Sequence, residues 1–433
     1  MYKFELPKKQ TDKPANQVNL TKVQLSFQRA GSVPQFYDLL PDMLKIEMDE
    51  SIDDNSMSMN ITFLDSTNLT NKIDFDGTET IQIDFHTLGD REVSAKYRIY
   101  KNDIVPDNTG NTKGVVLYGV SEEHFKSAVL DVNQSYREQI SGFAKNVFDK
   151  LGSEKEIEIH ETSGRGVTII PGMTPFESMD FLASRAYDTS YRSSAYKFFE
   201  TLSGFHFVNI EKTIAEGKKN ALTYVKVQDA RTGLPKWNHV STLNLQVAKD
   251  SMHKIKSGMY ASEAKEVDLI NHKVVTSDFV LAEQFDEFEH LDQDAMSLES
   301  VDFIEDSLNI INTSFWLFSG QTGETDNQSL NFVDIIPRRM YYLSALEQVK
   351  ASMEIPGHSS MSPGMVINLD MLEVTSKTKG KEQEGKISGN YFVTDVKHLI
   401  TRDEYVCLIK TCKDSYRSNV PVPEKNIVSK RTS

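Results

Sequence analysis

Apolar and polar residues alternate in short runs along the first hundred residues, and this pattern predicts β-strands. Alternation with a period of two places apolar side chains on one face of a strand and polar side chains on the other. In Ser58–Asp65, for example, Met59, Ile61 and Phe63 share one face. Gly, Asp and Asn turn signals separate the runs, so we expect an antiparallel barrel over residues 18–103. The expected strands are Val18–Phe27, Met43–Met48, Ser58–Asp65, Ile81–Phe85 and Ala95–Tyr100.

The pattern changes to helical spacing after a linker with Pro, Asn and Gly at Ile104–Gly114. Apolar residues recur every three or four positions from Phe125 to Leu151, which predicts one long helix. Ser121 is placed to cap the beginning of this helix and Gly152 to end it.

A second helix is predicted just after residue 174 because its capping residues are all present. Thr174 is the N-cap, Pro175 occupies the first helical position, and Glu177 completes a capping box. The run Ala195–Phe207 then reads as an aromatic hairpin with Gly204 at its turn. The residues that this helix is expected to bury are Met179, Leu182 and Ala186.

Strand patterns return in the C-terminal half and predict a second barrel. Two β-branched and aromatic runs flank the polar connection Thr401–Glu404 and predict a hairpin over residues 387–414. Both of its faces carry apolar residues, so both must be covered. Two short strands within Ile355–Leu369 precede the hairpin, after a helix from Arg338 to about Met353. The other expected strands of this barrel are Val240–Val247, Gly258–Ala261 and Glu266–Ile270.

These elements predict an α+β, mainly β fold with two tube-like antiparallel barrels and a mixed α/β domain between them. The first barrel takes residues 18–103, and the second takes 238–281 with 338–417. The mixed domain takes 104–237 with 282–337. Residues 1–17 are expected to form a flexible arm, and residues 418–433 an extended tail.

Composition narrows the class of protein. The 433 residues are 39% hydrophobic and 26% charged, which is typical of a globular protein of two to four domains. No apolar run is long enough for a membrane segment, and Met1–Gln10 lacks the core of a signal peptide. We therefore expect a protein that is made and used without secretion. Cys407 and Cys412 fall on opposite faces of one strand, so we expect two buried thiols.

The net charge of −15 is concentrated in one segment, residues 274–337, which holds fourteen carboxylates and no lysine or arginine. With no basic face elsewhere, tight binding to nucleic acid is disfavoured. Such a segment is most often a solvated or repelling face, and it could line a channel or meet a partner. The candidate residues are Glu283, Asp286, Glu287, Glu289, Asp292, Asp294, Asp302, Glu305 and Asp306.

Catalytic, metal and cofactor motifs do not emerge from the sequence, so we expect no enzyme activity, no metal and no cofactor. His160-Glu161 stands alone, and His206 and His398 lie in predicted strands, where a structural role is expected. The alternative is an enzyme with a catalytic pair of carboxylates. Its carboxylate pair would come from residues 283–306 or from around His160.

Several motifs resemble the baseplate hub proteins of contractile-tailed phages, whose barrel is shared by the spike proteins of type VI secretion systems. In the first barrel these motifs are Glu50–Asp53, Thr62–Ser66 and Gly77–Glu79. In the middle, Pro175–Ala186 and Phe198–Phe207 are similar to a helix and hairpin of the family. Near the C-terminus the matching residues are Pro356–His358, Pro363–Ile367, Ser388–Tyr391, Val396–His398, Tyr405 and Lys413–Asp414.

The resemblance implies a structural virion protein that is synthesised in the host bacterial cytoplasm and located in the tail baseplate. It implies a homotrimer whose two barrels per chain form a pseudo-hexameric ring. The implied partners are the tail tube ring, a trimeric cell-puncturing spike and the end of the tape-measure protein. DNA would pass through without specific binding. The related alternatives are a baseplate-associated cell-wall hydrolase and a hub or spike subunit of a tailocin or of a type VI secretion system.

Overall fold

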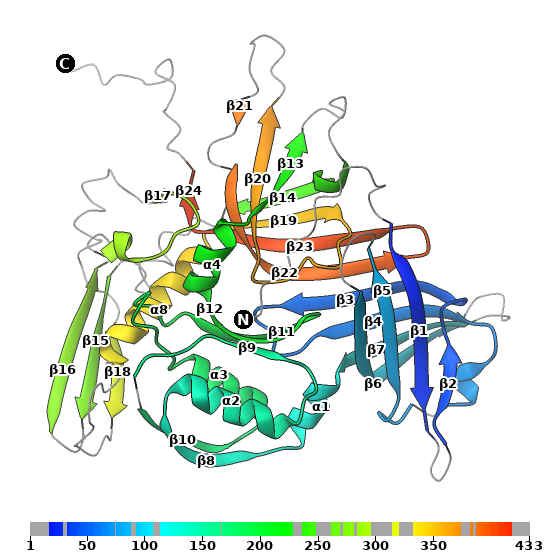
Figure 1. Cartoon of the computed structure of the whole chain (residues 1–433), viewed down its shortest axis with the longest axis horizontal. Helices are drawn as coiled ribbons and strands as arrows, with labels where there is room; N and C mark the ends of the chain where they lie inside the picture. Colours follow the sequence, from blue (N-terminus) through cyan, green and yellow to red (C-terminus); the bar gives the residue numbers. More distant parts are fainter. Residues whose placement is uncertain are drawn as a thin grey trace.

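The computed structural model describes residues 17–417 except 29–32, 74, 88–91, 107–112, 165, 228–235, 248–260, 269–271, 281–283, 296–313, 320–331, 374–381 and 384–386. These residues form many strands and few helices, which confirms a mainly β, α+β fold (Figure 1). The expected arm, the expected tail and the strand at Gly258 lie outside the described residues, apart from Gln17 and Ala261.

A 14-stranded sheet dominates the molecule, with strands in the order β14-β19-β23-β22-β3-β4-β7-β6-β5-β1-β2. In addition, β20 pairs with β22, and β13 and β21 pair with β20. It combines strands from the two ends of the chain (Figure 1). The N-terminal strands are β1 (Asn19–Phe27), β2 (Gln35–Asp38), β3 (Met43–Ser51), β4 (Ser58–Asp65), β5 (Thr80–His86), β6 (Val93–Pro106) and β7 (Lys113–Ser121). The C-terminal strands are β13 (Leu222–Val227), β14 (Thr242–Val247), β19 (Val349–Pro356), β20 (Val366–Glu373), β21 (Glu382–Gln383), β22 (Gly389–Thr401) and β23 (Tyr405–Lys413).

The five strands predicted in the N-terminal region all form, and their alternating residues point into the core as expected. The linker predicted at residues 104–114 is wrong at both of its ends, and residues 107–112 lie outside the described part of the chain. β6 continues to Pro106, and β7 begins at Lys113 and pairs with both β4 and β6. β6 pairs with β5 through Val93–Arg98 and with β7 through Tyr97–Pro106, with a register shift between Ile99 and Lys101.

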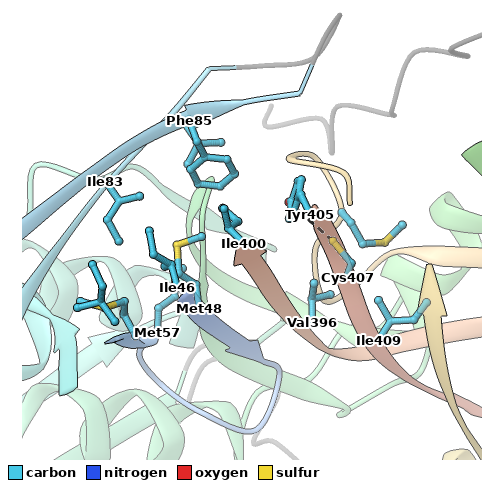
Figure 2. Close-up of a cluster of buried hydrophobic side chains, with 14 of the residues drawn as sticks. Ile46, Met48, Met57, Ile83, Phe85, Val396, Ile400, Tyr405, Cys407 and Ile409 are labelled. Atoms are coloured by element: carbon cyan, nitrogen blue, oxygen red, sulfur yellow. Dashed lines mark hydrogen bonds between the residues drawn. The ribbon is translucent and has the colours of Figure 1, made fainter. Parts of the chain in front are cut away.

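The N-terminal and C-terminal strand groups are joined at one seam, where β3 pairs antiparallel with β22 from Lys45–Thr401 to Ser51–Asp395. One apolar core lies beneath both groups. Figure 2 shows Ile46 and Met48 of β3 beside Ile83 and Phe85 of β5, with Val396, Ile400 and Tyr405 of the β22–β23 hairpin facing them. The pairing order runs as an open path from β14 to β2, so barrel closure within the chain is not among the described strand pairings.

The middle of the chain forms a mixed α/β unit around a second core. Helices α2 (Ile140–Leu151) and α3 (Pro175–Ala183) pack together between a two-stranded ribbon and a three-stranded sheet (Figure 1). The ribbon is β8 (Val132–Glu138) with β10 (Gly166–Met173), and the sheet is β9 (Ile157–Ile159), β12 (Gly204–Asn209) and β11 (Tyr196–Thr201). Helices α1 (Glu122–Ala128) and α4 (Ile210–Lys218) flank this unit.

The single helix predicted from Ser121 to Leu151 was wrong, because α1 ends at Ala128 and β8 intervenes before α2. Val132 and Tyr136 are four residues apart, an even number, so this spacing puts them on one face of a strand as well as of a helix. Pairing with β10 decides for the strand. The predicted end at Gly152 is confirmed, since Gly152 caps α2 in the left-handed conformation.

The capping box of α3 and the aromatic hairpin after it are confirmed. Thr174 accepts the amide of Glu177, whose side chain accepts the amide of Thr174 in return. Gly204 has φ 134°, and a Cβ there would lie 2.6 Å from the carbonyl oxygen of Glu156. Only glycine therefore fits this turn between β11 and β12.

A third sheet is separate from the main one and has the order β16-β15-β18. Its strands are β15 (Ala261–Asp268), β16 (Lys273–Val280) and β18 (Ser314–Ser319), and helix α8 (Phe332–Leu346) packs on β15 and β16. The assignment of Glu266–Ile270 to the second barrel was wrong, because β15 pairs with β16 and β18. The short elements are β17 (Asp294–Ala295), β24 (Ser415–Tyr416), η1 (Leu69–Asn71), η2 (Lys236–Asn238) and η3 (Phe285–Glu287).

The helix predicted from Arg338 to about Met353 ends earlier, at Leu346. Residues from Val349 form β19 instead, with alternate side chains buried. The C-terminal hairpin is confirmed as β22 and β23, and different parts of it pack on two cores. Cys407 belongs to the main core and Cys412 to the core shared with α8, so the two thiols point apart as predicted.

Candidate functional site

The acidic segment singled out by the sequence contacts the body of the protein through residues 287–292, which we call the acidic strap. On its helix side, Arg338 of α8 donates to Glu287 at 2.8 Å, and Arg192 lies 2.9 Å from the same carboxylate. The ring of Phe288 packs against Tyr341 with centroids 4.7 Å apart. This end of the strap is therefore held by two guanidinium groups and an aromatic contact.

The middle of the strap lies against α4 and α8. Lys218 of α4 pairs with the carboxylate of Glu289 and also donates to the carbonyl of His290 at 2.6 Å. The hydroxyl of Tyr342 donates to the carbonyl of Glu289 at 3.0 Å. The backbone N–H of Glu289 donates to the buried carboxylate of Glu211 at 3.4 Å.

The other end of the strap is fixed to Lys413, the last residue of β23, and to Asp414, which follows it. His290 Nδ1 lies 2.8 Å from one carboxylate oxygen of Asp414, and the N–H of Leu291 donates to the other at 3.1 Å. Asp292 pairs with Lys413 at 2.7 Å, and their side chains are 6% and 0% exposed. The strap therefore connects helices α4 and α8 to the C-terminal hairpin.

The structure brings together some of the predicted acidic residues and not others. Glu287, Glu289 and Asp292 face cations of the same chain, whereas Asp286 is exposed. Asp294 lies in β17, which pairs with β24. The residues that fall outside the described part of the chain are Glu283, Asp302, Glu305 and Asp306. A channel or partner face made by these carboxylates stays a prediction.

A second ionic cluster lies at the seam between β3 and β22. His398 Nε2 is 2.7 Å from Glu50, with both side chains 0% exposed, and its Nδ1 is 2.7 Å from the hydroxyl of Tyr405. Burial lowers the pKa of His398, but the neighbouring Cys407 and Glu50 outweigh it and raise the pKa to about 10. Glu50 also accepts the N–H of Leu202 at 3.2 Å, so this carboxylate joins the mixed unit to the seam.

A third cluster joins the first strand group to the mixed unit. Lys155 lies 2.8 Å from Glu123 and 2.5 Å from the fully buried Glu200, which also accepts the N–H of Met57. Burial raises the pKa of Glu200, and Lys155 only partly offsets this effect. Glu123 is also buried, but Lys155 and the hydroxyl of Ser121 lower its pKa to about 2. Lys155 thus lowers the pKa of both carboxylates, and burial outweighs this effect only at Glu200.

The two histidines of the mixed unit, His160 and His206, are buried and contact protein groups. His160 accepts the N–H of Asn209, while Glu161 is exposed, so the two neighbours in sequence do not act as a pair. Glu158 lies 3.0 Å from His206 and 3.7 Å from His160. Burial raises the pKa of Glu158, but the two imidazoles lower it to about 2.

The chemistry open to these clusters is limited by access. Cys407 lies 3.5 Å from His398, which in turn contacts Glu50, an order that resembles a nucleophile, base and orienting acid. All three are 2% exposed or less, so no substrate reaches the thiol. Among the described residues, no group of three or more His, Cys, Asp or Glu side chains could hold a metal ion.

Sequence reasoning missed the cationic partners that define these clusters. Lys413 and Asp292 are far apart in the chain, as are Lys155 and Glu200. The one available signal was the resemblance motif Lys413–Asp414, which marks residues that both bind the acidic strap.

The fold is similar to that of two solved tail proteins. The structure is similar to the tail protein from Neisseria meningitidis MC58, with a TM-score of 0.51 and 10% identity over 91% of this chain and 96% of that one. It is also similar to the 43 kDa tail protein of prophage MuSo2 from Shewanella oneidensis, with a TM-score of 0.52 and 9% identity over 91% of this chain and 99% of that one.

The sequence itself is similar to a particular kind of tail protein. It is 23% identical over 389 residues to the probable baseplate hub protein gp334 of Vibrio phage KVP40, covering 82% of this chain and 85% of that protein. No family model matches the chain. The predicted resemblance to phage baseplate hub proteins is thereby confirmed. No helix among the described residues is long and apolar enough to span a membrane.

Proposed function

We propose that this chain is the central hub subunit of a phage tail baseplate, a structural virion protein without enzyme activity. Three copies form a ring that connects the hexameric tail tube to a trimeric cell-puncturing spike. The ring leaves a channel through which DNA passes. The observation that carries this proposal is the similarity to a probable baseplate hub protein over more than four-fifths of both chains.

The strand order supports ring formation. β3 and β22 join two strand groups edge to edge, and β14 and β2 are the ends of the described sheet. An exposed sheet edge has unpaired backbone groups that favour pairing with another chain. In a ring, each copy covers the sheet edges of its neighbours, so no edge stays exposed. A head-to-tail contact that closes on itself generates cyclic symmetry.

The acidic segment supports a channel that does not retain DNA. Glu287, Glu289 and Asp292 are neutralised by cations, so the repelling charge falls to the other carboxylates of residues 274–337, among them the exposed Asp278 and Asp286. Fixed negative charge repels a polyanion within about a Debye length, roughly 8–10 Å at physiological salt. The end of the tape-measure protein is a further partner within the same channel.

The test is the mass of the purified protein in solution, alone and mixed with the tail tube and spike proteins. We expect a mass of three chains for the protein alone and complexes with each partner. Phe36→Asp places a charge on β2, where Phe36 is 62% exposed, and we expect it to weaken the trimer. Val129→Asp, at an 82% exposed position outside the sheet, is the matched control. A monomeric wild-type protein, or equal effects of both variants, would contradict the proposal.

A further inference from the structure

We propose that β14 of one copy pairs with β2 of the next copy, so that the main sheet continues from chain to chain. The inference rests on the proposed function and deepens it, because it names the two strands that form the contact between copies. β14 and β2 are the two ends of the described strand order, and they lie apart within one chain (Figure 1). The contact between them is therefore one between copies.

β14 has the features of an edge strand that is covered in the assembly. Its residues, Thr-Leu-Asn-Leu-Gln-Val, include no charge and no proline. Six consecutive residue pairs join it to β19 without a register shift, and β19 is its only partner among the described strands. Edge strands that stay exposed are commonly protected by charges, prolines or bulges. β16, an edge of the third sheet, has Lys273 and Asp278, whereas β14 has none of these protections.

The main core is incompletely covered at both ends of the sheet. Leu243 and Leu245 of β14 and Tyr37 of β2 are only partly buried where they pack on this core. Leu245 lies opposite the buried Ala351, and Tyr37 lies opposite the buried Leu25, so these side chains are on the core face of their strands. Pairing of β14 with β2 brings the three side chains together and removes apolar surface from water, which favours association.

The opposite face of the two strands is compatible with the same pairing. Successive side chains of a strand point to opposite faces, so Phe36, which is 62% exposed, lies on the face away from the core. The residues of β14 on that face are exposed and uncharged, so the ring of Phe36 would cover no buried charge. These residues are Thr242, Asn244 and Gln246.

The choice of β2 as the partner follows from symmetry. A contact between β14 and β2 uses different surfaces of the two copies, and such a contact closes into a ring when the rotation fits. A contact between two β14 strands would be self-complementary and would end at a dimer. The two arrangements predict different cross-links.

The experiment is disulfide cross-linking of the full-length protein, after its mass in solution has been measured. Phe36→Cys is combined in turn with Thr242→Cys, Asn244→Cys and Gln246→Cys, because these three positions span the exposed face of β14. Directly opposed residues of paired strands have Cβ atoms about 4.5–5.5 Å apart, close to the separation of about 3.5–4.5 Å in a disulfide. The native Cys407 and Cys412 are 0% and 4% exposed, so they stay out of the reaction.

After mild oxidation we expect at least one of the three double variants to shift from one chain to two and three chains on a denaturing gel without reductant. Each single variant should remain one chain. Val129→Cys with Asn244→Cys is the matched control and should also remain one chain, since Val129 is 82% exposed outside the sheet. Amide hydrogen exchange of the wild-type peptide covering residues 242–247 needs no substitution and should show β14 protected along both edges in the assembled protein.

Three outcomes would overturn the pairing of β14 with β2. One is a protein with the mass of three chains in which none of the double variants cross-links, or in which β14 exchanges as an open edge. Another is a two-chain product from Asn244→Cys alone, which would show a contact between two β14 strands. The third is equal cross-linking of the Val129→Cys control. A mass of one chain is a different result, because it contradicts the proposed ring itself.

Discussion

Buried ion pairs hold the separate parts of this chain together, and the Glu50–His398 pair at the seam makes a first prediction. Glu50→Ala leaves a buried imidazolium unpaired and should lower the free energy of unfolding by about 3–5 kcal/mol. The pKa of His398 is raised from 6.5 to about 10, so the contribution of the pair is complete below pH 6.5 and is lost as pH rises through 10. Urea unfolding at pH 7 and pH 10 measures both effects.

The control is Glu47→Ala, which removes the half-exposed pair with Lys45 on the same strand. It should cost less than about 1 kcal/mol. Equal losses for Glu50→Ala and Glu47→Ala would show that the buried pair has no special weight. A wild-type protein that keeps its full stability through pH 10 would show that His398 is neutral at the seam.

The Lys155 cluster makes a second prediction at the same scale. Lys155→Ala leaves Glu200 buried without its cation and should cost about 3–5 kcal/mol. The pKa of Glu123 is lowered to about 2, so its contribution is present above pH 4.5 and is lost as pH falls through 2. Chemical denaturation measures the effect on Lys155→Ala. The same measurement is made on the control Lys145→Ala, on the exposed face of α2, and on the double variant Lys155→Met with Glu200→Gln. A double variant no more stable than Lys155→Ala would contradict this account.

Residue types alone predicted the role of some buried groups and not of others. His206, His398 and the two cysteines were expected to be structural, and their strand positions place them inside. The acidic residues were expected to form a face, yet Glu287, Glu289 and Asp292 turn toward cations. A run of carboxylates specifies its own charge but not the distant lysine or arginine that tertiary folding places beside it.

At the scale of single elements, the capping box of α3 is the feature that sequence specifies most completely. Thr174→Ala removes the acceptor for the amide of Glu177 and should destabilise the protein by about 1 kcal/mol. Thr174→Ser keeps a hydroxyl acceptor and should remain within a few tenths of a kcal/mol of wild type. Thermal unfolding by circular dichroism measures both, and equal losses would show that the methyl group of threonine, not the cap, carries the effect.

The local pattern of apolar residues predicted the strands of the main sheet better than it predicted which strands pair with one another. Each of the five N-terminal strands alternates cleanly because one face is buried. The helix predicted across residues 121–151 fails at β8, where spacing of four suits either structure and only the β10 partner decides. The assignment of β15 fails for a similar reason, since alternation shows that a strand has a buried face but not which sheet it joins.

At the scale of the whole molecule, the seam between β3 and β22 turns two distant strand groups into one cooperative unit. Side chains of β3 and β5 pack against the β22–β23 hairpin in a common core (Figure 2). The sheet of β15, β16 and β18 is less buried, because most of β16 is exposed. Val274 and Val275 of this strand are 63% and 46% exposed. Cooperative units open with a common free energy, and units with few buried contacts open more easily.

Native-state hydrogen exchange in low urea should therefore separate these two units. Peptides from β4 and β22 should open with free energies equal within about 1 kcal/mol, although they are more than three hundred residues apart in the chain. A peptide from the first half of β16 should open at lower urea concentration, since that half lies outside any core. Val396→Ala in the seam core should lower the opening free energy of β4 and β22 together and leave β16 unchanged. If β4 stayed unchanged while β22 weakened, the two strand groups would be independent domains that merely touch at the seam.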